Sequence, residues 1–257
     1  MYREKLNLTR QVAVVTGGAR NIGLACATAF GEAGARIVIT DIDDSAGNAA
    51  VAQLRATGFE ASFEHMDVCN SKEVNSVADK IQQQFGSIDI LVANAGICFN
   101  TPGEEISDEE WARVVDINFN GVFYCDRAFG RHMLNNPAGG RIINIGSISG
   151  QIAPKPQPQC HYNATKAAVH MLTKSLAAEW AQRGVRVNAI APTYVETDIT
   201  KRGMANPEWF KTWMDMTPLG RMGQPSEIAS VALFLASDLS SLITGAVVVA
   251  DGGYTCW

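Results

Sequence analysis

Short β-branched runs alternate with longer amphipathic segments along most of the chain, and this alternation constrains the fold more than any other feature. Several of the short runs are continuously apolar, as expected when helices cover both faces of a parallel sheet. Glycines that follow helix-like stretches and precede strand-like runs stand where helix C-caps are expected. These glycines are Gly34, Gly58, Gly86 and Gly184, and the strand-like runs are 12–15, 36–41, 61–68, 88–96, 141–147, 185–192 and 246–251. The pattern predicts an α/β fold, a doubly wound parallel sheet of about seven strands with helices on both faces.

The chain length and the lack of a linker indicate one domain. A chain of 257 residues with 47% apolar residues can build a single large α/β core. No Ser/Pro-rich segment divides it, so we expect residues 1–257 to form one dinucleotide-binding and catalytic domain. Two stretches, 153–161 and 194–223, show no regular pattern, and we expect the substrate to be read there, above all by a loop at about 194–223.

Charge and cysteine usage exclude several classes of protein. The chain has 21 basic and 26 acidic residues, and no Lys/Arg cluster of the kind that binds nucleic acid or an anionic membrane. The first residues are charged where a signal peptide is apolar, and no apolar run approaches a membrane span. The six cysteines form no CxxC pair, so we expect neither a metal site nor a disulfide framework, and a cytoplasmic location.

A glycine-rich turn follows the first strand. The sequence Thr16-Gly17-Gly18-Ala19-Arg20-Asn21-Ile22-Gly23 opens a helix, and such a turn can direct backbone N–H groups and the helix N-terminus at a pyrophosphate. Asn21 replaces the middle glycine of a TGxxxGxG pattern, but Asn readily adopts left-handed backbone conformations, so the turn can survive. Taken alone, the stretch is also compatible with a turn that binds no ligand.

An acidic residue ends the second strand. Asp41 follows Gly23 by 18 residues, close to the spacing expected for a carboxylate that binds the adenosine ribose. A carboxylate there favours NAD and repels the 2′-phosphate of NADP. Arg20 could attract that phosphate, but we give Asp41 more weight because it would stand directly against the ribose. The alternative is that Asp41, with Asp43 and Asp44, only supplies charge at a helix N-terminus.

Tyr162 and Lys166 begin a long helix and lie on one of its faces. They continue the line of an apolar stripe formed by Val169, Leu172, Leu176 and Trp180, where an ammonium group is costly to bury without a task. A YxxxK pair alone is common by chance. Its context is more specific, because Ser147 ends the fifth strand and Asn118 lies in a helical segment that begins near Ser107.

These segments together resemble the short-chain dehydrogenase/reductase family. The motifs TGGARNIG, Asp67-Val68, Ala93-Asn94-Ala95-Gly96, Asn118, Ser147, YNATK and Asp251-Gly252-Gly253 occur in the family's order and span nearly the whole chain. The resemblance implies a single Rossmann-type domain that binds NAD(H) or NADP(H) and forms tetramers or dimers.

The resemblance also implies roles for four residues. Tyr162 is the expected general acid/base, Lys166 lowers its pKa and holds the nicotinamide ribose, Ser147 bonds the substrate oxygen, and Asn118 tethers a water of the proton relay. A free tyrosine, with a pKa near ~10, is a poor base unless a cation stabilises the phenolate.

The cofactor contacts expected from the residues and the resemblance run along most of the chain. They are Gly17, Arg20, Asn21, Ile22, Gly23, Asp41, Ile42, Asp67, Val68, Asn94, Gly96, Tyr162, Lys166, Pro192, Val195 and Thr197. Two have simple structural alternatives, since Asp67 could cap a turn and Asn94 could bridge two strands. Besides Asn21, the chain departs from the family at Thr193, where a glycine is common after Pro192.

Within the family, EWAQRGVRVNAIAP, MTPLGR and DGGYTCW are similar to members that act on polyols, such as galactitol, arabinitol, sorbitol or xylitol dehydrogenases. The expected substrate contacts are Ser147, Ser149, Gln157 and Tyr162, with Gln151, Gln159, His161 and Glu196 as further polar candidates. Trp209, Phe210, Trp213 and Met214 could form an apolar lid or only pack on the core.

The function expected from these features is an NAD-dependent, homotetrameric enzyme that interconverts a polyol and its ketose. One alternative is a reductase of a 3-oxoacyl thioester or another carbonyl substrate, for which an apolar channel with a basic mouth is more natural. A non-catalytic dinucleotide-binding regulator is the other, and the presence of all four catalytic residues argues against it.

Overall fold

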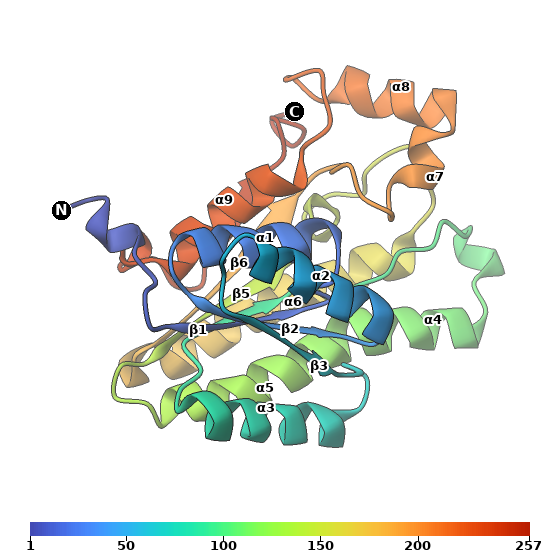
Figure 1. Cartoon of the computed structure of the whole chain (residues 1–257). Coiled ribbons are helices and arrows are strands. Elements are labelled where there is room, and N and C mark those ends of the chain that lie inside the picture. Colours follow the sequence, from blue (N-terminus) through green and yellow to red (C-terminus); the bar gives the residue numbers. More distant parts are fainter.

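A seven-stranded parallel sheet forms the centre of the computed structural model, which describes residues 1–257. The strand order is β3-β2-β1-β4-β5-β6-β7 (Figure 1). The strands are β1 (Val12–Thr16), β2 (Arg36–Asp41), β3 (Ala61–His65), β4 (Ile90–Ala93), β5 (Gly140–Ile145), β6 (Val185–Pro192) and β7 (Val247–Ala250). The predicted fold class is therefore confirmed. The third and fourth strands are shorter than the runs 61–68 and 88–96 that the sequence suggested. The strand β3 ends at His65, and β4 spans only Ile90–Ala93.

Helices cover both faces of the sheet, as Figure 1 shows. The helices α1 (Asn21–Glu32), α2 (Asp44–Ala56) and α9 (Pro225–Ala236) pack on one face, and α3 (Ser71–Phe85), α5 (Gly121–Leu134) and α6 (Cys160–Trp180) on the other. Alternate residues of β1 separate the two cores, since Ala13 and Val15 join the first and Val12 and Val14 the second. Burial on both faces explains why the strand-like runs are continuously apolar.

Local signals in the sequence set many helix ends. The four glycines expected as C-caps all have left-handed backbone, with φ between +80° and +93°. The helix α4 (Asp108–Val115) begins after Ser107, whose side chain accepts the Glu110 N–H, and α3 begins after Asn70, which accepts the Glu73 N–H. A short π-helical turn, Asp116–Asn120, joins α4 to α5.

The segment 194–223 is not the irregular loop that the sequence suggested. It contains α7 (Lys201–Met204) and α8 (Pro207–Met216), which stand clear of the two helical layers in Figure 1. Asn206 accepts the N–H groups of Glu208 and Trp209, and Pro207 occupies the first helical position, so α8 has a regular start. The other stretch, 153–161, is irregular up to Gln159, and α6 begins at Cys160. A single 3₁₀ turn, Ile148–Gly150, precedes this stretch.

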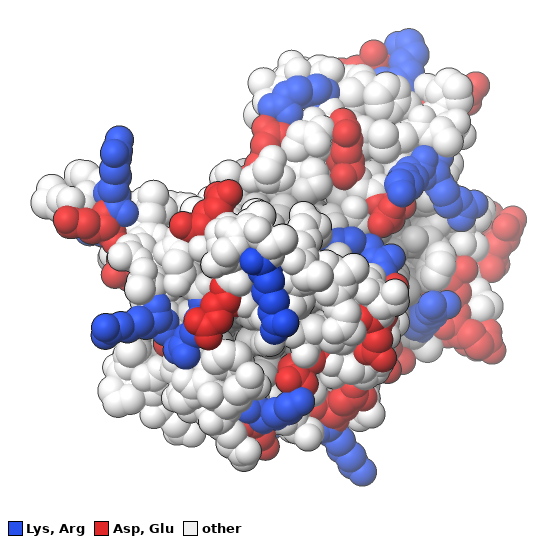
Figure 2. Space-filling model, in the orientation of Figure 1, with Lys and Arg blue, Asp and Glu red and all other residues white.

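Charged side chains of both signs are mixed on the face shown in Figure 2, where Lys and Arg alternate with Asp and Glu. None of the helices combines the length and the apolar composition that crossing a bilayer requires.

Candidate active site

The order of the strands places a site at the carboxyl ends of β1 and β4. These two strands are neighbours, although the chain runs from β1 out to β3 before it returns to β4. Loops leave such a switch point in opposite directions, which opens a crevice for ligands. A cavity that opens to solvent lies there, lined by residues that follow β4, β5 and β6 and by the start of α6.

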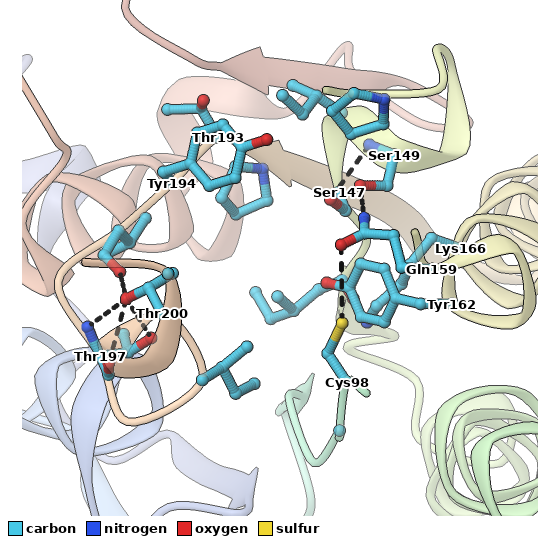
Figure 3. A pocket seen from close by; sticks show the side chains of 18 of the residues that line it. Cys98, Ser147, Ser149, Gln159, Tyr162, Lys166, Thr193, Tyr194, Thr197 and Thr200 are labelled. Atoms are coloured by element: carbon cyan, nitrogen blue, oxygen red, sulfur yellow. Dashed lines mark hydrogen bonds between the residues drawn. The ribbon is translucent and has the colours of Figure 1, made fainter. Parts of the chain in front are cut away.

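Three of the four expected catalytic residues line this cavity. Ser147 follows β5, and Tyr162 and Lys166 lie on the first turns of α6 (Figure 3). Ser147 Oγ accepts the backbone N–H of Ser149 at 3.1 Å, which fixes the Ser147 side chain. The hydroxyl groups of Ser147 and Tyr162 both face the cavity and lie near one another. This pair can hold one oxygen atom of a substrate and exchange a proton with it.

Burial raises the pKa of Tyr162, and the nearby Ser147 hydroxyl acts in the opposite direction. This upward shift is opposite to the lowering expected from Lys166. The ammonium nitrogen lies 5.6 Å from the centre of the Tyr162 ring. It donates a hydrogen bond to the backbone carbonyl of Ile145 at 2.7 Å.

Lys166 is buried, and its burial lowers the pKa of the ammonium group to about 8. A lysine ammonium has three donors, of which one is used by Ile145. The group also lines the cavity. The remaining donors are therefore available to hydroxyl groups of a ligand, such as those of a ribose.

Asn118 lies directly behind the cavity wall in the π-helical turn and is fully buried. Its side chain makes two hydrogen bonds to Ile97, accepting the N–H and donating to the carbonyl, both at 2.8 Å. A Cβ atom at Gly96 would lie 3.3 Å from Asn118 Oδ1 and 3.7 Å from Lys166 Nζ. Asn118 thus fixes the loop after β4 beside the lysine.

The glycine-rich turn has the backbone that its sequence predicts. Gly17 and Asn21 have φ of +59° and +50°, so Asn21 adopts the left-handed conformation that we expected of it. A Cβ atom at Gly23 would lie only 2.3 Å from the Gly17 carbonyl oxygen, so only glycine allows this close approach. The Asn21 side chain donates to Asp198 Oδ2 at 2.9 Å, which links the turn to the segment after β6.

The end of β2 presents a carboxylate beside this turn. Asp41 accepts the backbone N–H groups of Ala19 at 3.3 Å and Asp43 at 3.1 Å. Arg20 is paired with Asp43, whose side chain also caps α2 by accepting the Ala46 N–H. Arg20 is therefore already engaged by a carboxylate.

Two expected cofactor contacts make the structural bonds that we named as alternatives. Asp67 Oδ1 accepts the N–H of Cys69 at 2.9 Å, as in a turn. Asn94 Nδ2 donates to the carbonyls of Thr16 at 3.0 Å and Gly17 at 2.9 Å, and so joins the ends of β1 and β4. Asn94 nevertheless lines the cavity, so it can do both.

The residues fit a nicotinamide dinucleotide. The cavity brings together Ile22, Asn94, Gly96, Tyr162, Lys166, Pro192, Val195 and Thr197. The other expected contacts, Gly17, Arg20, Asn21, Gly23, Asp41, Ile42, Asp67 and Val68, lie outside it, at the carboxyl ends of β1, β2 and β3 and the start of α1. A helix N-terminus suits the pyrophosphate, Asp41 suits ribose hydroxyls, and Lys166 suits the second ribose.

Some of the residues expected to contact the substrate line the cavity, and others do not. Ser149, Gln157 and Gln159 line the cavity with Ser147 and Tyr162. Three candidates do not line it. Gln151 and Glu196 are exposed, and His161 is fully buried against Glu110 at 3.0 Å. The structure thus places these three side chains outside the cavity, which the sequence could not show because it gives no rotation for the start of α6 and no direction for loop side chains.

The aromatic residues of the segment 194–223 form a wall behind Gln157. Gln157 Nε2 donates to the Tyr194 hydroxyl at 2.9 Å, and its Oε1 accepts the Trp213 N–H at 3.0 Å. The rings of Tyr194 and Trp213 are stacked, with centroids 3.9 Å apart. Trp209 and Met214 pack against this cluster and Phe210 is partly exposed. Trp213 is therefore both a core residue and part of the cavity wall.

Sequence reasoning missed several cavity residues, among them Cys98, Asn100, Tyr194 and Thr200. No motif marks them. The signals were their positions after β4 and β6 and, for Tyr194 and Thr200, the segment 194–223 where we expected the substrate to be read. Among all side chains that line the cavity, Lys166 alone is charged, and the polar remainder are amides, hydroxyls and one thiol.

Known proteins are similar to this chain over nearly its whole length. The family model described as enoyl-(acyl carrier protein) reductase matches residues 17–255. The chain is 47% identical to a galactitol 2-dehydrogenase of Rhizobium johnstonii, over 100% of this chain and 99% of the relative. It is 44% identical to the L-tagatose-forming galactitol 2-dehydrogenase of Cereibacter sphaeroides, with the same coverage. It is also 38% identical to the 3-oxoacyl-[acyl-carrier-protein] reductase FabG of Chlamydia pneumoniae, over 97% and 99%.

Solved structures are similar over the whole chain. The crystal structure of gox2181 matches with a TM-score of 0.98 and 52% identity, covering 100% of both chains. A gluconate 5-dehydrogenase from Burkholderia cenocepacia J2315, solved in complex with NADP and tartrate, matches with a TM-score of 0.96 and 35% identity, again over 100% of both chains.

Proposed function

Since the chain belongs to the short-chain dehydrogenase/reductase family, and is therefore an oxidoreductase that uses a nicotinamide dinucleotide, we propose that it interconverts a polyol and its ketose with NAD. One observation carries the proposal. The cavity joins the Ser147 and Tyr162 hydroxyls to further amides and hydroxyls, set among apolar side chains, and Lys166 is its one charged group. Such walls suit a neutral substrate with many hydroxyl groups. The relatives described as galactitol 2-dehydrogenases support this substrate class.

The residues of the chain divide the chemistry among them. A nicotinamide held beside Lys166 would supply hydride exchange at the carbon that carries the reacting oxygen. Ser147 holds that oxygen, and Tyr162 takes the hydroxyl proton during oxidation and returns it during reduction. Lys166 holds the ribose beside them, and its positive charge favours the phenolate form of the tyrosine. Asn118 fixes the loop after β4 and tethers a water of the proton relay.

The cavity favours a polyol over two other substrates of related enzymes. A sugar acid would bring a carboxylate into a cavity whose only cation, Lys166, is assigned to the nicotinamide ribose. A 3-oxoacyl thioester is the second candidate, and the FabG relative and the apolar lining residues Ile148, Pro154 and Ile199 favour it. The amides and hydroxyls around the catalytic pair would remain unpaired beside an acyl chain, which is costly.

The preference for NAD rests on Asp41 and on the Arg20–Asp43 pair. The Asp41 carboxylate would bond the ribose hydroxyls and repel a 2′-phosphate. Arg20 would have to leave Asp43 to bind that phosphate. Because the gluconate 5-dehydrogenase neighbour was solved with NADP, this preference needs a direct test.

We also propose that the enzyme is a cytoplasmic homo-oligomer, a tetramer by analogy with its family. All six cysteines are unpaired, as is usual in a reducing compartment. Apolar side chains are exposed at Val249 in the edge strand β7, at Leu242 near that strand and at Trp111 on α4. Exposed apolar side chains of this kind suit contacts between subunits. The segment 194–223, which contains Tyr194 and Trp213, is the part of the chain that we expect to read the substrate.

The experiment that tests the function measures reduced nucleotide formed by the purified protein from a panel of sugar alcohols and sugar acids, with NAD and NADP in parallel. Oxidation of a polyol with NAD, and much less with NADP or with a sugar acid, is the expected result. Reduction of a 3-oxoacyl thioester without any polyol oxidation would select the second candidate. Binding of NADH without turnover of any substrate would select the regulator.

A further inference from the structure

Gln159 lies on the same wall of the cavity as the catalytic pair. It is the last residue before α6, three residues ahead of Tyr162, and its side chain is buried. Figure 3 shows Gln159 beside Tyr162, Ser147 and Ser149, across the cavity from Tyr194 and Thr197. The proposed mechanism gives Gln159 no role, so its polar atoms need another explanation.

The two ends of the Gln159 amide differ in how well they are bonded. The Nε2 group donates to Ser149 Oγ at 3.1 Å and to Asn163 Oδ1 at 2.9 Å, which uses both of its hydrogens. The Oε1 atom has only a thiol, Cys98 Sγ at 3.8 Å, and Asn100 Nδ2 at 3.5 Å. A thiol is a weak donor, and the amide contact is longer than an ordinary hydrogen bond. Gln159 Oε1 is therefore a buried acceptor with room for a better donor.

Ser149 has the complementary property. Its N–H donates to Ser147 Oγ, and its own Oγ accepts from Gln159. No protein group accepts the hydroxyl proton of Ser149, so this proton can be donated to a ligand. An acceptor on Gln159 and a donor on Ser149 thus lie side by side, one hydrogen bond away from the oxygen of Ser147.

We propose that Gln159 and Ser149 bind a second hydroxyl group, on the carbon next to the reacting carbinol, so that the enzyme selects vicinal diols. This inference rests on the proposed function. An alcohol can donate to Gln159 and accept from Ser149 at once, whereas a carbonyl or thioester oxygen only accepts. A site built for a hydroxyl group rejects analogues that lack it, because its own polar groups are then left unpaired.

The test compares butane-2,3-diol with butan-2-ol, in the wild type and in Gln159→Met. The added oxygen withdraws electrons and slows hydride loss, so intrinsic reactivity favours butan-2-ol. We expect the wild type to prefer the diol in kcat/KM by about tenfold or more. In Gln159→Met, kcat/KM for the diol should fall about tenfold while that for butan-2-ol changes little. Gln83→Met, the same change at an exposed position of α3, should leave both values unchanged.

The possible outcomes separate this inference from the proposed function. Equal losses on the two substrates would show that Gln159 only holds the fold of the site, and would overturn the inference. A wild type without preference for the diol would overturn it even if the variant failed to fold. Ser149→Ala provides an independent check, since it should reduce the same preference. If no alcohol or polyol is oxidised with either nucleotide, the proposed function fails and the inference fails with it.

Discussion

At the scale of single residues, the ligands that the site can bind depend on which polar side chains have no partner within the protein. Lys166 gives one donor to Ile145 and keeps the others for a ligand. Arg20, a cation that would suit a phosphate, is instead held by Asp43. The chemistry of the site is thus set by which groups the fold has already paired as much as by which residues are present.

Tyr162→Phe removes only the hydroxyl group that we assign to proton transfer. Turnover should fall by about 10² or more, because general acid/base transfer is worth that much. Binding of NADH, followed by its fluorescence, should change little, since Lys166 and the other contacts that we assign to the nucleotide remain. Tyr124→Phe, on α5, is the matched control and should affect neither quantity. Substantial turnover by Tyr162→Phe would refute the proton role.

Asp41→Ala removes the carboxylate that we place against the adenosine ribose. The ratio of the dissociation constants for NADPH and NADH should narrow by about tenfold or more, because like charges placed together cost several kcal/mol. Fluorescence titration with both nucleotides measures this ratio without any turnover. Asp44→Ala, in the first turn of α2, removes an exposed carboxylate nearby and should leave the ratio as it is. An unchanged ratio in Asp41→Ala would place the ribose elsewhere.

At the scale of elements, the close contact between the glycine-rich turn and α1 determines whether a pyrophosphate can bind. Asn21 starts α1 in a left-handed conformation, and Gly23 lets the helix approach the Gly17 carbonyl. The turn is further tied to the ends of β1 and β4 through Asn94. The phosphate-binding surface is therefore a property of three elements held together.

Gly23→Ala tests this contact. The new Cβ atom would lie 2.3 Å from the Gly17 oxygen, so the turn or the helix must move. We expect NADH binding to weaken by at least about tenfold, together with a lower melting temperature, as for other overpacked sites. Gly103→Ala is the matched control, because its Cβ would meet only Cys160 Sγ at 3.6 Å. Unchanged NADH affinity in Gly23→Ala would show that the pyrophosphate binds away from this turn.

Much of the arrangement of elements could be predicted from the sequence, because the signals are local. The periodicity gave the sheet, the glycines gave helix ends, and the spacing of Tyr162 and Lys166 gave a shared helix face. The segment 194–223 was misjudged because α8 is short, although Asn206 and Pro207 mark its start.

The sequence could not tell Gln159 from His161, which stand two residues apart. Gln159 lines the cavity, whereas His161 is buried against Glu110 of α4. Which of them faces the substrate depends on the residue at which α6 begins and on its rotation against α4. Both are tertiary properties that no local pattern carries.

At the scale of the whole molecule, the same sheet that opens the site also buries a carboxyl group in the core behind it. Asp126 of α5 is fully buried, and it accepts a hydrogen bond from Asn144 of β5 at 3.0 Å. Its other oxygen, Oδ1, has no partner, and neither has Asn144 Oδ1. Asn144 also donates to Thr173 of α6. This cluster couples the helices of one face to the centre of the sheet, so its protonation affects the stability of the whole fold.

Burial raises the pKa of Asp126 from 3.8 to about 7, against the lowering by the Asn144 hydrogen bond. The folded protein therefore keeps a proton that the unfolded chain loses as the pH rises above about 4. Stability should fall between the unfolded and folded pKa values, that is from about pH 4 to pH 7, and then level off. Asp126→Asn cannot titrate, and its amide can donate to the free Asn144 oxygen. Its melting temperature should therefore exceed that of the wild type by a margin that grows from pH 5 to pH 7 and is constant above pH 8.

Calorimetry at a series of pH values measures this margin, and Glu60→Gln controls for the loss of one negative charge at an exposed position. The difference between Glu60→Gln and the wild type should not follow the same curve, because Glu60 is not buried in the core. A constant margin for Asp126→Asn across this pH range would mean that Asp126 titrates alike in the folded and unfolded chains. The buried cluster would then not link the protonation of the core to the stability of the fold.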